Sequence, residues 1–381
     1  MASPSAIDQL DIIQRVAIQI SQGLSRATLT TFIYAEAGEP PITSHIKRIT
    51  INYIIRAPRR QQSTAIIRIV RDRFQKDPRM FPTVIRALKM MAEYRFPNEW
   101  MKGDMVLEPG VTPETLKKIE SFELKEGDIL IATYPKTGTT WMQELVWLIC
   151  NNGDIKQARS MPIFERVPFF EYKLDGVKSG LDVLQERPRP YMIKTHFRSE
   201  IYQSQIEAGK VKIIVGIRNP KDTLVSLYHF YRMNNNLGNF KGTWDDFFEL
   251  YKTKHIVFGD YFKWYSYWLQ YKDKPNVKLI KYEDMHHRMS DVIDDVCQFL
   301  GKTLSRDAIP DIIQHLTFND MSKNPMVNFN ALDLLDKDIS PFMRKGKIGD
   351  WKNYFSEEQS SVVDKHYREV IEPLGVKLEF E

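Results

Sequence analysis

Basic residues, hydroxyls and a histidine follow short apolar runs in this 381-residue chain, a pattern suited to binding anions and transferring protons. One run ends at Thr133 and leads into Tyr134-Pro-Lys-Thr-Gly-Thr-Thr-Trp141 and then a helical pattern. In that loop Gly138 permits a close backbone approach, the Thr139-Thr140 hydroxyls stand at a helix start, and Lys136 adds a cation. The loop predicts a cradle for a phosphate-like group; a simple helix cap is the alternative.

The residue order of this loop differs from that of a Walker A motif. GxxxxGK[ST] needs the lysine after the glycine and then a hydroxyl for magnesium. Here Lys136 precedes Gly138, and Trp141 stands where that hydroxyl would follow. We therefore expect a phosphate-like group to be held without nucleoside triphosphate and magnesium chemistry.

A histidine ends the second apolar run, Met192-Ile-Lys-Thr-His196. Lys194 and His196 are two positions apart, so they face the same side of a strand end. Ligands of parallel sheets bind at the carboxyl ends of the strands. His196 is thus a candidate general base beside a lysine and an anion loop, with a structural histidine as the alternative.

Two further basic segments could hold a second anion. The run Val211–Ile217 leads into Arg218-Asn-Pro-Lys-Asp222, so Arg218 and Ser226 could converge on a phosphate; a helix-capping Arg–Asp pair is the alternative. Near the C-terminus, Arg344-Lys-Gly-Lys-Ile-Gly-Asp-Trp-Lys352 predicts a flexible cationic loop that could close over a phosphate or remain solvated.

Apolar runs of strand length alternate with helical patterns from about Phe96 onward. This alternation predicts an α/β fold with a P-loop-like central parallel sheet flanked by helices. The expected strands are Ile129–Ala132, Tyr191–Ile193, Ile213–Ile217 and Val277–Ile280, and the expected helices Trp141–Cys150, Thr223–Tyr231, Trp244–Tyr251 and Val292–Leu300.

A charge break near residue 90 predicts two parts. Residues 1–90 carry 14 Lys and Arg against 6 Asp and Glu, a net charge of +8, whereas residues 91–381 carry 40 against 43, a net charge of −3. Apolar spacing predicts that residues 1–90 form a small, mostly helical extension. It could be a solvated helical addition, a basic arm for an acidic partner or membrane surface, or a transit segment.

Composition narrows the class of protein. With 43% hydrophobic and 27% charged residues, the chain is not wholly disordered, collagen-like or coiled-coil. Its two cysteines, Cys150 and Cys297, cannot build a disulfide framework, which favours a reducing compartment. No apolar run approaches the roughly 18 residues of a membrane span, and no secretory leader pattern opens the chain. We expect a cytoplasmic protein with no nucleic-acid partner.

Together the basic segments resemble the cytosolic sulfotransferase family. YPKTGTTW resembles its 5′-phosphosulfate loop and RNPKDTLVSLYHFY (218–231) its 3′-phosphate segment, while KYEDM (281–285) and RKGKIGDWKNYF (344–355) resemble two further signatures. The resemblance covers about Phe96 to Glu381, so a domain over 91–381 is expected, with residues 1–90 outside it. It implies 3′-phosphoadenosine 5′-phosphosulfate (PAPS) as sulfuryl donor.

By position, the resemblance implies three groups of donor contacts. The 5′-phosphosulfate is assigned to Lys136, Thr137, Gly138, Thr139 and Thr140, the adenine side to Trp141, Tyr282, Thr317, Phe318 and Met321, and the 3′-phosphate to Arg218, Ser226, Arg344, Lys345 and Gly346.

It also implies an in-line displacement without a metal. His196 would take the proton of the acceptor, Lys136 would neutralise the oxygen that bridges to the departing phosphate, and Lys194 would neutralise the sulfuryl oxygens. No metal-ligand spacing occurs in the sequence.

The sequence gives fewer residues for the acceptor site than for the donor site, and a small, largely apolar acceptor is expected. Phe169, Phe170 and Phe230 are the candidate contacts, and Glu171 could favour a cationic amine. The aromatic stretch Tyr261–Trp268 falls where family members carry a mobile gate; its rings could line the pocket or belong to the core.

One departure concerns assembly. The family dimer motif would continue after Lys352 with Thr, Val and Glu, where this chain has Ser356, Glu357 and Ser361. A homodimer is therefore possible, but its usual contact is degraded. A small-molecule or nucleoside kinase and a non-catalytic nucleotide-binding protein are the alternative functions.

Overall fold

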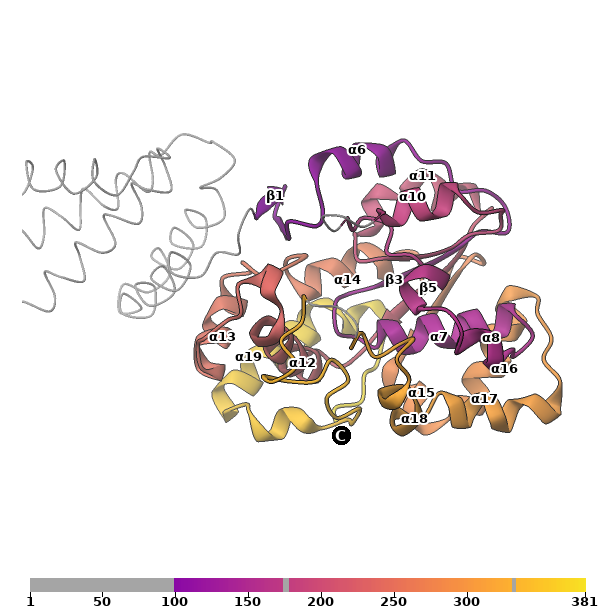
Figure 1. Cartoon of the computed structure of the whole chain (residues 1–381). Helices are drawn as coiled ribbons and strands as arrows, with labels where there is room; N and C mark the ends of the chain where they lie inside the picture. Colours follow the sequence, from indigo (N-terminus) through magenta and orange to yellow (C-terminus); the bar gives the residue numbers. More distant parts are fainter. Residues whose placement is uncertain (1–98, 174–177, 331–333) are drawn as a thin grey trace, which may run out of the picture. The chain divides into compact units, whose positions relative to one another are not determined.

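A computed structural model of the chain describes residues 99–173, 178–330 and 334–381 (Figure 1). The basic extension predicted for residues 1–90, and its boundary, lie outside the described residues and stay predictions. Two compact units appear. The smaller unit includes residues 99–107 and 242–259, and the larger spans 108–241 and 260–381.

The smaller unit contains a short antiparallel hairpin and one longer helix. Its strands are β1 (Trp100–Lys102) and β2 (Met105–Leu107), paired so that Trp100 faces Leu107. Its helix, α13 (Trp244–Lys252), begins with a capping box in which Thr243 and Asp246 exchange side-chain and backbone hydrogen bonds. This satisfies donors that would otherwise be unpaired at the helix start.

The larger unit is built on a parallel sheet, which confirms the predicted α/β fold. The strand order is β4-β3-β5-β6, with β3 (Ile129–Thr133), β4 (Met192–Thr195), β5 (Lys212–Ile217) and β6 (Val277–Lys281). β4 begins one residue later than predicted and continues through Lys194 and Thr195. Its polar residues belong to the strand because they pair with β3, Ile131 opposite Lys194 and Ala132 opposite Thr195.

Helices follow the strands, as crossover connections require. α7 (Thr139–Cys150) follows β3, α11 (Gln203–Ala208) follows β4, α12 (Pro220–Met233) follows β5, and α15 (Tyr282–His287) and α16 (Met289–Leu300) follow β6. The remaining helices of this unit are α6 (Pro113–Glu120), α8 (Ile155–Ala158), α9 (Ile163–Arg166), α10 (Gly180–Gln185), α14 (Tyr261–Leu269), α17 (Ile309–His315), α18 (Phe318–Lys323) and α19 (Glu357–Val370). Short 3-10 turns occupy Ser199–Ile201, Asn235–Leu237, Arg306–Ala308, Asp350–Asn353 and Glu372–Leu374.

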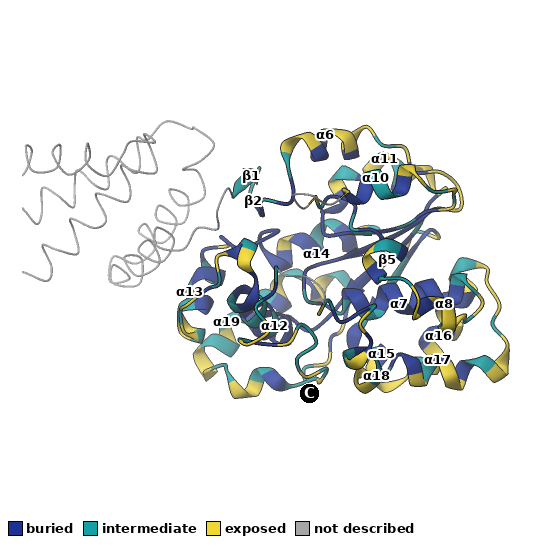
Figure 2. Cartoon of the chain, viewed as in Figure 1, coloured by how far each residue is buried: buried dark blue, intermediate teal, exposed yellow. Residues whose placement is uncertain are grey.

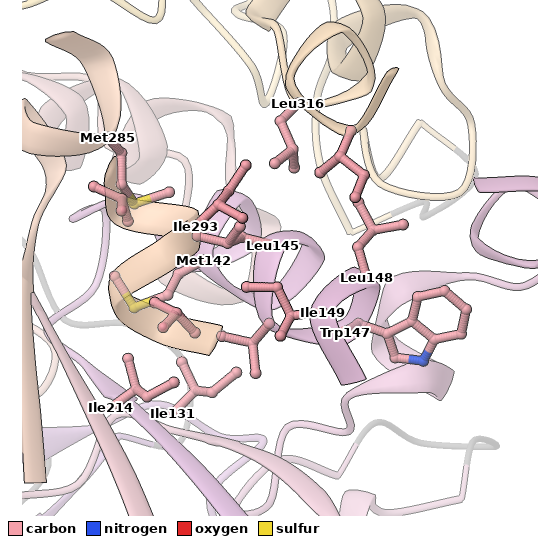
Figure 3. Packing of buried hydrophobic residues seen from close by; sticks show 14 of the residues in the cluster. Ile131, Met142, Leu145, Trp147, Leu148, Ile149, Ile214, Met285, Ile293 and Leu316 are labelled. Carbon is pink, nitrogen blue, oxygen red and sulfur yellow. The ribbon is translucent and has the colours of Figure 1, made fainter. Parts of the chain in front are cut away.

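One face of the sheet carries a hydrophobic core centred on α7. Ile131 and Ile214 from neighbouring strands pack with Met142 and Leu145 of α7 and with Ile293 of α16 (Figure 3). The central strands β3 and β5 are almost entirely buried and the edge strands β4 and β6 are partly buried, whereas the outer surfaces of the covering helices are exposed (Figure 2). The helix that follows the anion loop is thereby held rigidly against the sheet.

A helix of aromatic residues, α14, supports the carboxyl ends of the strands. Its polar-tipped rings Tyr261, Trp264, Tyr265 and Trp268 are 0% exposed and donate hydrogen bonds to the backbone carbonyls of Arg218, His196, Gly216 and Phe197, respectively. Of the two interpretations left open for this stretch, these rings therefore follow the core interpretation. A buried tyrosine or tryptophan needs a partner for its polar atom, and strand-end carbonyls supply one.

The packing of α7 yields a stability prediction. Leu145→Ala should lower the free energy of unfolding by about 2–5 kcal/mol, because the fully buried side chain leaves a cavity. Urea denaturation would measure the loss. Lys118→Ala on exposed α6 is the matched control and should change little. A similar small effect for both variants would contradict the packing described here.

Candidate active site

The loop between β3 and α7 turns sharply through two left-handed residues. Lys136 has φ 70° and Gly138 φ 91°, the latter serving as the N-cap of α7 without a side-chain cap. Glycine is needed at 138, because an added Cβ would lie 2.6 Å from Cδ2 of Tyr282. The Thr139 hydroxyl lies 2.7 Å from that of Thr133. The uncapped first turn of α7 suits an anion bound to its N–H groups.

His196 stands at the end of β4 with its tautomer set by the neighbouring strand. Its Nδ1 lies 2.6 Å from the carbonyl oxygen of Thr133, the last residue of β3. A carbonyl oxygen only accepts, so Nδ1 carries the proton and Nε2 is the basic nitrogen. Burial lowers the pKa of His196 well below 6.5, and the charge of Lys194 lowers it further. The imidazole is therefore neutral near pH 7.

Glu171 holds the backbone that carries this histidine. Its Oε1 accepts hydrogen bonds from the His196 N–H and, at 3.0 Å, from the Thr195 hydroxyl. The carboxylate is fully buried, and burial raises its pKa to about 7. These contacts direct Glu171 toward the strand end, so they do not support the expectation that it favours an amine acceptor.

Two lysines extend over aromatic rings near the strand ends. Lys194 Nζ lies 3.7 Å from the Phe169 ring centroid, and the Phe169 ring lies 4.9 Å from that of His196. Lys136 Nζ lies 4.7 Å from the ring of Phe230 and 4.1 Å from that of Phe342. Sequence reasoning missed Phe342, although it stands two residues before the basic loop at Arg344.

The two ammonium groups are poorly solvated cations. Burial, followed by the charges of Lys194, Arg218 and Arg344, lowers the pKa of Lys136 to about 7. Burial lowers the pKa of Lys194 to about 8, and Glu171 and Glu108 oppose that shift. An anion bound between these cations would stabilise their charged forms.

Phe170 and Phe169 have different surroundings. The Phe170 ring is 1% exposed and meets Phe122 edge-on at 5.1 Å. The Phe169 ring meets His196 instead. Phe169 is therefore the member of the pair that contacts the candidate base.

Arg218 joins the first loop to the C-terminal basic loop. Its Nη1 donates to the Lys136 carbonyl at 3.3 Å and its Nη2 to the Lys347 carbonyl at 3.1 Å. Its guanidinium carbon lies 4.1 Å from the Tyr282 ring centroid, and its Nε is buried without a hydrogen-bond partner. Ser226, its predicted companion, is half-buried on α12.

Aromatic residues predicted for the adenine side form two contacts. The ring of Trp141 meets that of Tyr282 edge-on at 5.3 Å, and Trp141 Nε1 is buried without a partner. The backbone of Gly346 lies against the 39% exposed ring of Phe318, since a Cβ there would be 2.2 Å from Cδ2. Thr317 caps α18, and Met321 is buried in the same helix.

Asp350 neutralises the cations of the C-terminal loop. Arg344 Nη2 and Lys345 Nζ each lie 2.6 Å from an oxygen of its carboxylate. Burial alone would raise the pKa of Asp350, but the bonds from Lys345, Arg344 and Asn353 prevail and lower it to about 2. The sequence analysis did not assign Asp350, although it lies inside the segment Gly349-Asp350-Trp351.

Asp222 anchors the same loop to the start of α12. Its carboxylate accepts from the N–H groups of Gly349 at 2.8 Å and Trp351 at 2.9 Å. Asp222 is 1% exposed, so the RNPKD segment contributes a loop anchor as well as a cation. This role depends on tertiary structure, because 127 residues separate Asp222 from Gly349.

Three further observations concern metal binding, membrane crossing and the segment that aligns with the family dimer motif. No group of three or more His, Cys, Asp or Glu residues suited to a metal occurs within 99–173, 178–330 and 334–381. In the same ranges, no helix combines the length and apolarity needed to cross a membrane. Ser356, which stands where the family dimer motif has threonine, forms a capping box with Gln359 at the start of α19. The dimeric state and the cytoplasmic location stay predictions.

Comparisons with known proteins agree on one family. Residues 126–375 match the family model described as a sulfotransferase domain. Sulfotransferase 1A1 of the dog (Canis lupus familiaris) is 36% identical over 284 residues, covering 74% of this chain and 95% of that protein. Sulfotransferase 1C2 of Homo sapiens is 37% identical over 273 residues, covering 71% of this chain and 92% of that protein.

Solved structures give the same picture. Retinol dehydratase, crystallised with androsterone and the inactive cofactor PAP, superposes with a TM-score of 0.63 at 25% identity, covering 71% of this chain and 90% of that chain. Mouse sulfotransferase SULT7A1, crystallised with PAP, superposes with a TM-score of 0.59 at 29% identity, covering 72% and 94%.

The buried imidazole predicts a pH dependence of stability. Below its ordinary pKa of 6.5, His196 takes up a proton in the unfolded chain but not in the folded one. The free energy of unfolding should therefore fall as the pH drops from 6.5, by up to about 1.4 kcal/mol per pH unit for this one group. Urea denaturation at several pH values should show a shallower fall in His196→Gln than in the wild type. Parallel curves would contradict the depressed pKa.

Proposed function

We propose that this chain, which belongs to the sulfotransferase family, transfers the sulfuryl group of PAPS to a hydroxyl or amine of a small, largely apolar acceptor. The observation that carries the proposal is the position of a neutral His196 beside Lys194, with Nε2 as its basic nitrogen. Family membership supports sulfuryl transfer itself. The donor, the base and the acceptor class are the proposed part.

The residues present fit a donor with two separated anionic groups. The 5′-phosphosulfate would lie at the loop Lys136–Thr140, where α7 begins without a side-chain cap. The 3′-phosphate would meet Arg218, Ser226, Arg344, Lys345 and Gly346. Two buried nitrogens without partners, Arg218 Nε and Trp141 Nε1, are orphaned donors that a bound ligand could satisfy.

The adenine would lie near the rings of Trp141 and Phe318, with Tyr282, Thr317 and Met321 around it. The 39% exposed ring of Phe318, which lies against Gly346 of the basic loop, supports this assignment, because it offers an accessible aromatic surface next to the proposed 3′-phosphate site. The structures of retinol dehydratase and mouse SULT7A1 with PAP also support a donor of this kind.

The proposed reaction is a displacement at sulfur. His196 Nε2 takes the acceptor proton as the acceptor oxygen or nitrogen forms a bond to sulfur. The bond from sulfur to the bridging oxygen breaks, and its electron pair stays on the 5′-phosphate. Lys136 would stabilise that departing oxygen and Lys194 the equatorial sulfuryl oxygens, both acting where charge develops.

The acceptor would lie beside the Phe169 ring, which contacts both Lys194 and His196. Phe230, over which Lys136 lies, is the second proposed contact, and Phe170 would support the first from the core. Androsterone bound to retinol dehydratase supports an apolar acceptor.

The donor assignment predicts ligand-induced stabilisation. Adenosine 3′,5′-bisphosphate should raise the melting temperature without magnesium, because it binds the folded chain only. Adenosine 5′-monophosphate, which lacks the second phosphate, is the control and should raise it less. Differential scanning fluorimetry would measure the shifts. Greater stabilisation by ATP with magnesium would favour a kinase and contradict the proposal.

Two substitutions should separate chemistry from donor binding. His196→Ala should abolish turnover yet keep bisphosphate affinity, because a general base acts in the transition state. Arg218→Ala should weaken bisphosphate binding by roughly 1.5–3 kcal/mol, the value of a charged hydrogen bond. Isothermal titration calorimetry and a labelled-sulfonate assay give the two readouts.

Exposed residues provide matched controls for both variants. His287→Ala and Arg306→Ala remove the same side-chain types from positions that are 52% and 78% exposed, and both should behave as wild type. Undiminished turnover in His196→Ala would remove the histidine from the mechanism.

A further inference from the structure

A buried carboxylate that the proposed reaction does not use lies near the acceptor side. Glu108 is 6% exposed and directly follows β2. Its side-chain hydrogen bond among the described residues is a long one, 3.4 Å from Oε2 to the Tyr172 hydroxyl. That hydroxyl accepts from Asn236 Nδ2 at 2.8 Å, so its own proton is the one directed at Glu108. One long bond leaves most of the acceptor capacity of this carboxylate unused.

Backbone contacts place this carboxylate relative to the reacting groups. The turn from Glu108 to Val111 closes with a 2.9 Å hydrogen bond, and within it Gly110 lies against the Tyr172 ring, where a Cβ would come within 2.4 Å. Tyr172 stacks on Phe169 with centroids 5.3 Å apart and planes 5° apart. A chain of contacts therefore links His196 to Glu108 through the Phe169 ring and then the Tyr172 ring and hydroxyl.

Glu108 and Lys194 act on each other electrostatically without touching. Burial raises the pKa of Glu108 to about 7, and Lys194 partly opposes the shift. Among the described residues no ion pair joins the two, and the Lys194 ammonium lies over Phe169 instead. A buried carboxylate without a direct cation costs stability, which is easier to explain if a ligand supplies the missing charge.

We propose that Glu108 selects acceptors that carry a cationic amine in addition to the hydroxyl that is sulfated. The inference rests on the proposed function and names its acceptor class. Lys136 and Lys194 repel an ammonium from the sulfuryl end, whereas Glu108 attracts it beside the Tyr172 hydroxyl. The hydroxyl is thereby directed to His196. Phe169 and Tyr172 are both only partly buried, so an aromatic acceptor could pack beside their exposed edges, and a phenolic amine fits best.

Tyramine and 4-propylphenol test the proposal, because the second compound replaces the ammonium by a methyl group. The wild type, assayed with PAPS at pH 8, should show the higher kcat/KM for tyramine. Glu108→Gln should lower the ratio of kcat/KM for tyramine to that for 4-propylphenol roughly tenfold or more, the loss expected for a charge-assisted hydrogen bond. Glu114→Gln removes an equal charge from a 77% exposed position of α6 and should keep the wild-type ratio.

Glu108→Asp controls for a folding defect, because it keeps the carboxylate at this position. It should therefore still prefer tyramine over 4-propylphenol. An equal fall for both acceptors in Glu108→Gln would overturn the proposal and assign Glu108 to support of Lys194. A wild type that sulfates 4-propylphenol without preferring tyramine would also overturn it while leaving the proposed function intact. The proposed function itself fails if the wild type sulfates neither phenol and adenosine 3′,5′-bisphosphate leaves its melting temperature unchanged.

Discussion

The parallel pairing of β3 with β4 is the constraint on which the site depends. It sets Ala132 opposite Thr195, so the next residues, Thr133 and His196, meet at the same sheet edge. There the Thr133 carbonyl fixes the proton on His196 Nδ1. A slip of one residue would turn Lys194 and His196 to the other face of the strand. Glu171 and Trp264 hold the same backbone from two sides, through the N–H and the carbonyl of His196.

Several cations lie around that sheet edge, and the buried carboxylates near it form different kinds of contact. Asp350 pairs directly with Arg344 and Lys345, and Asp222 fixes the loop that carries them. Glu171 accepts hydrogen bonds from a backbone N–H and a hydroxyl, whereas Glu108, within the described part of the chain, accepts one long bond from the Tyr172 hydroxyl. Lys136, in contrast, lies over aromatic rings and near other cations, so a bound anion would stabilise its charged form.

Rigid packing behind the loops gives this charge pattern its precision. The core face of the sheet holds α7 through Met142 and Leu145, while α14 ties its buried aromatic side chains to strand-end carbonyls. The loop between β3 and α7 is thus a short connection between two fixed elements. A loop that is to bind an anion through its backbone N–H groups needs such rigid packing, because backbone donors cannot move independently of one another.

The sequence alone determined the fold class and the expectation that the site lies at the strand ends. Strand-length apolar runs followed by Lys136, His196 and Arg218 predicted an α/β fold with chemistry at the strand ends, because apolar periodicity and strand-end position are local properties. The edges of β4 were misjudged, since Lys194 and Thr195 join the strand only through pairing with β3. The sequence left open whether the aromatic residues of α14 line a pocket or belong to the core, because composition cannot distinguish a buried ring from a lining one; the structure places them in the core. Only the tertiary structure decided the tautomer of His196, the pairing of Asp350 and the surroundings of Glu171 and Glu108. Each depends on groups distant in the chain, and no local pattern carries that information.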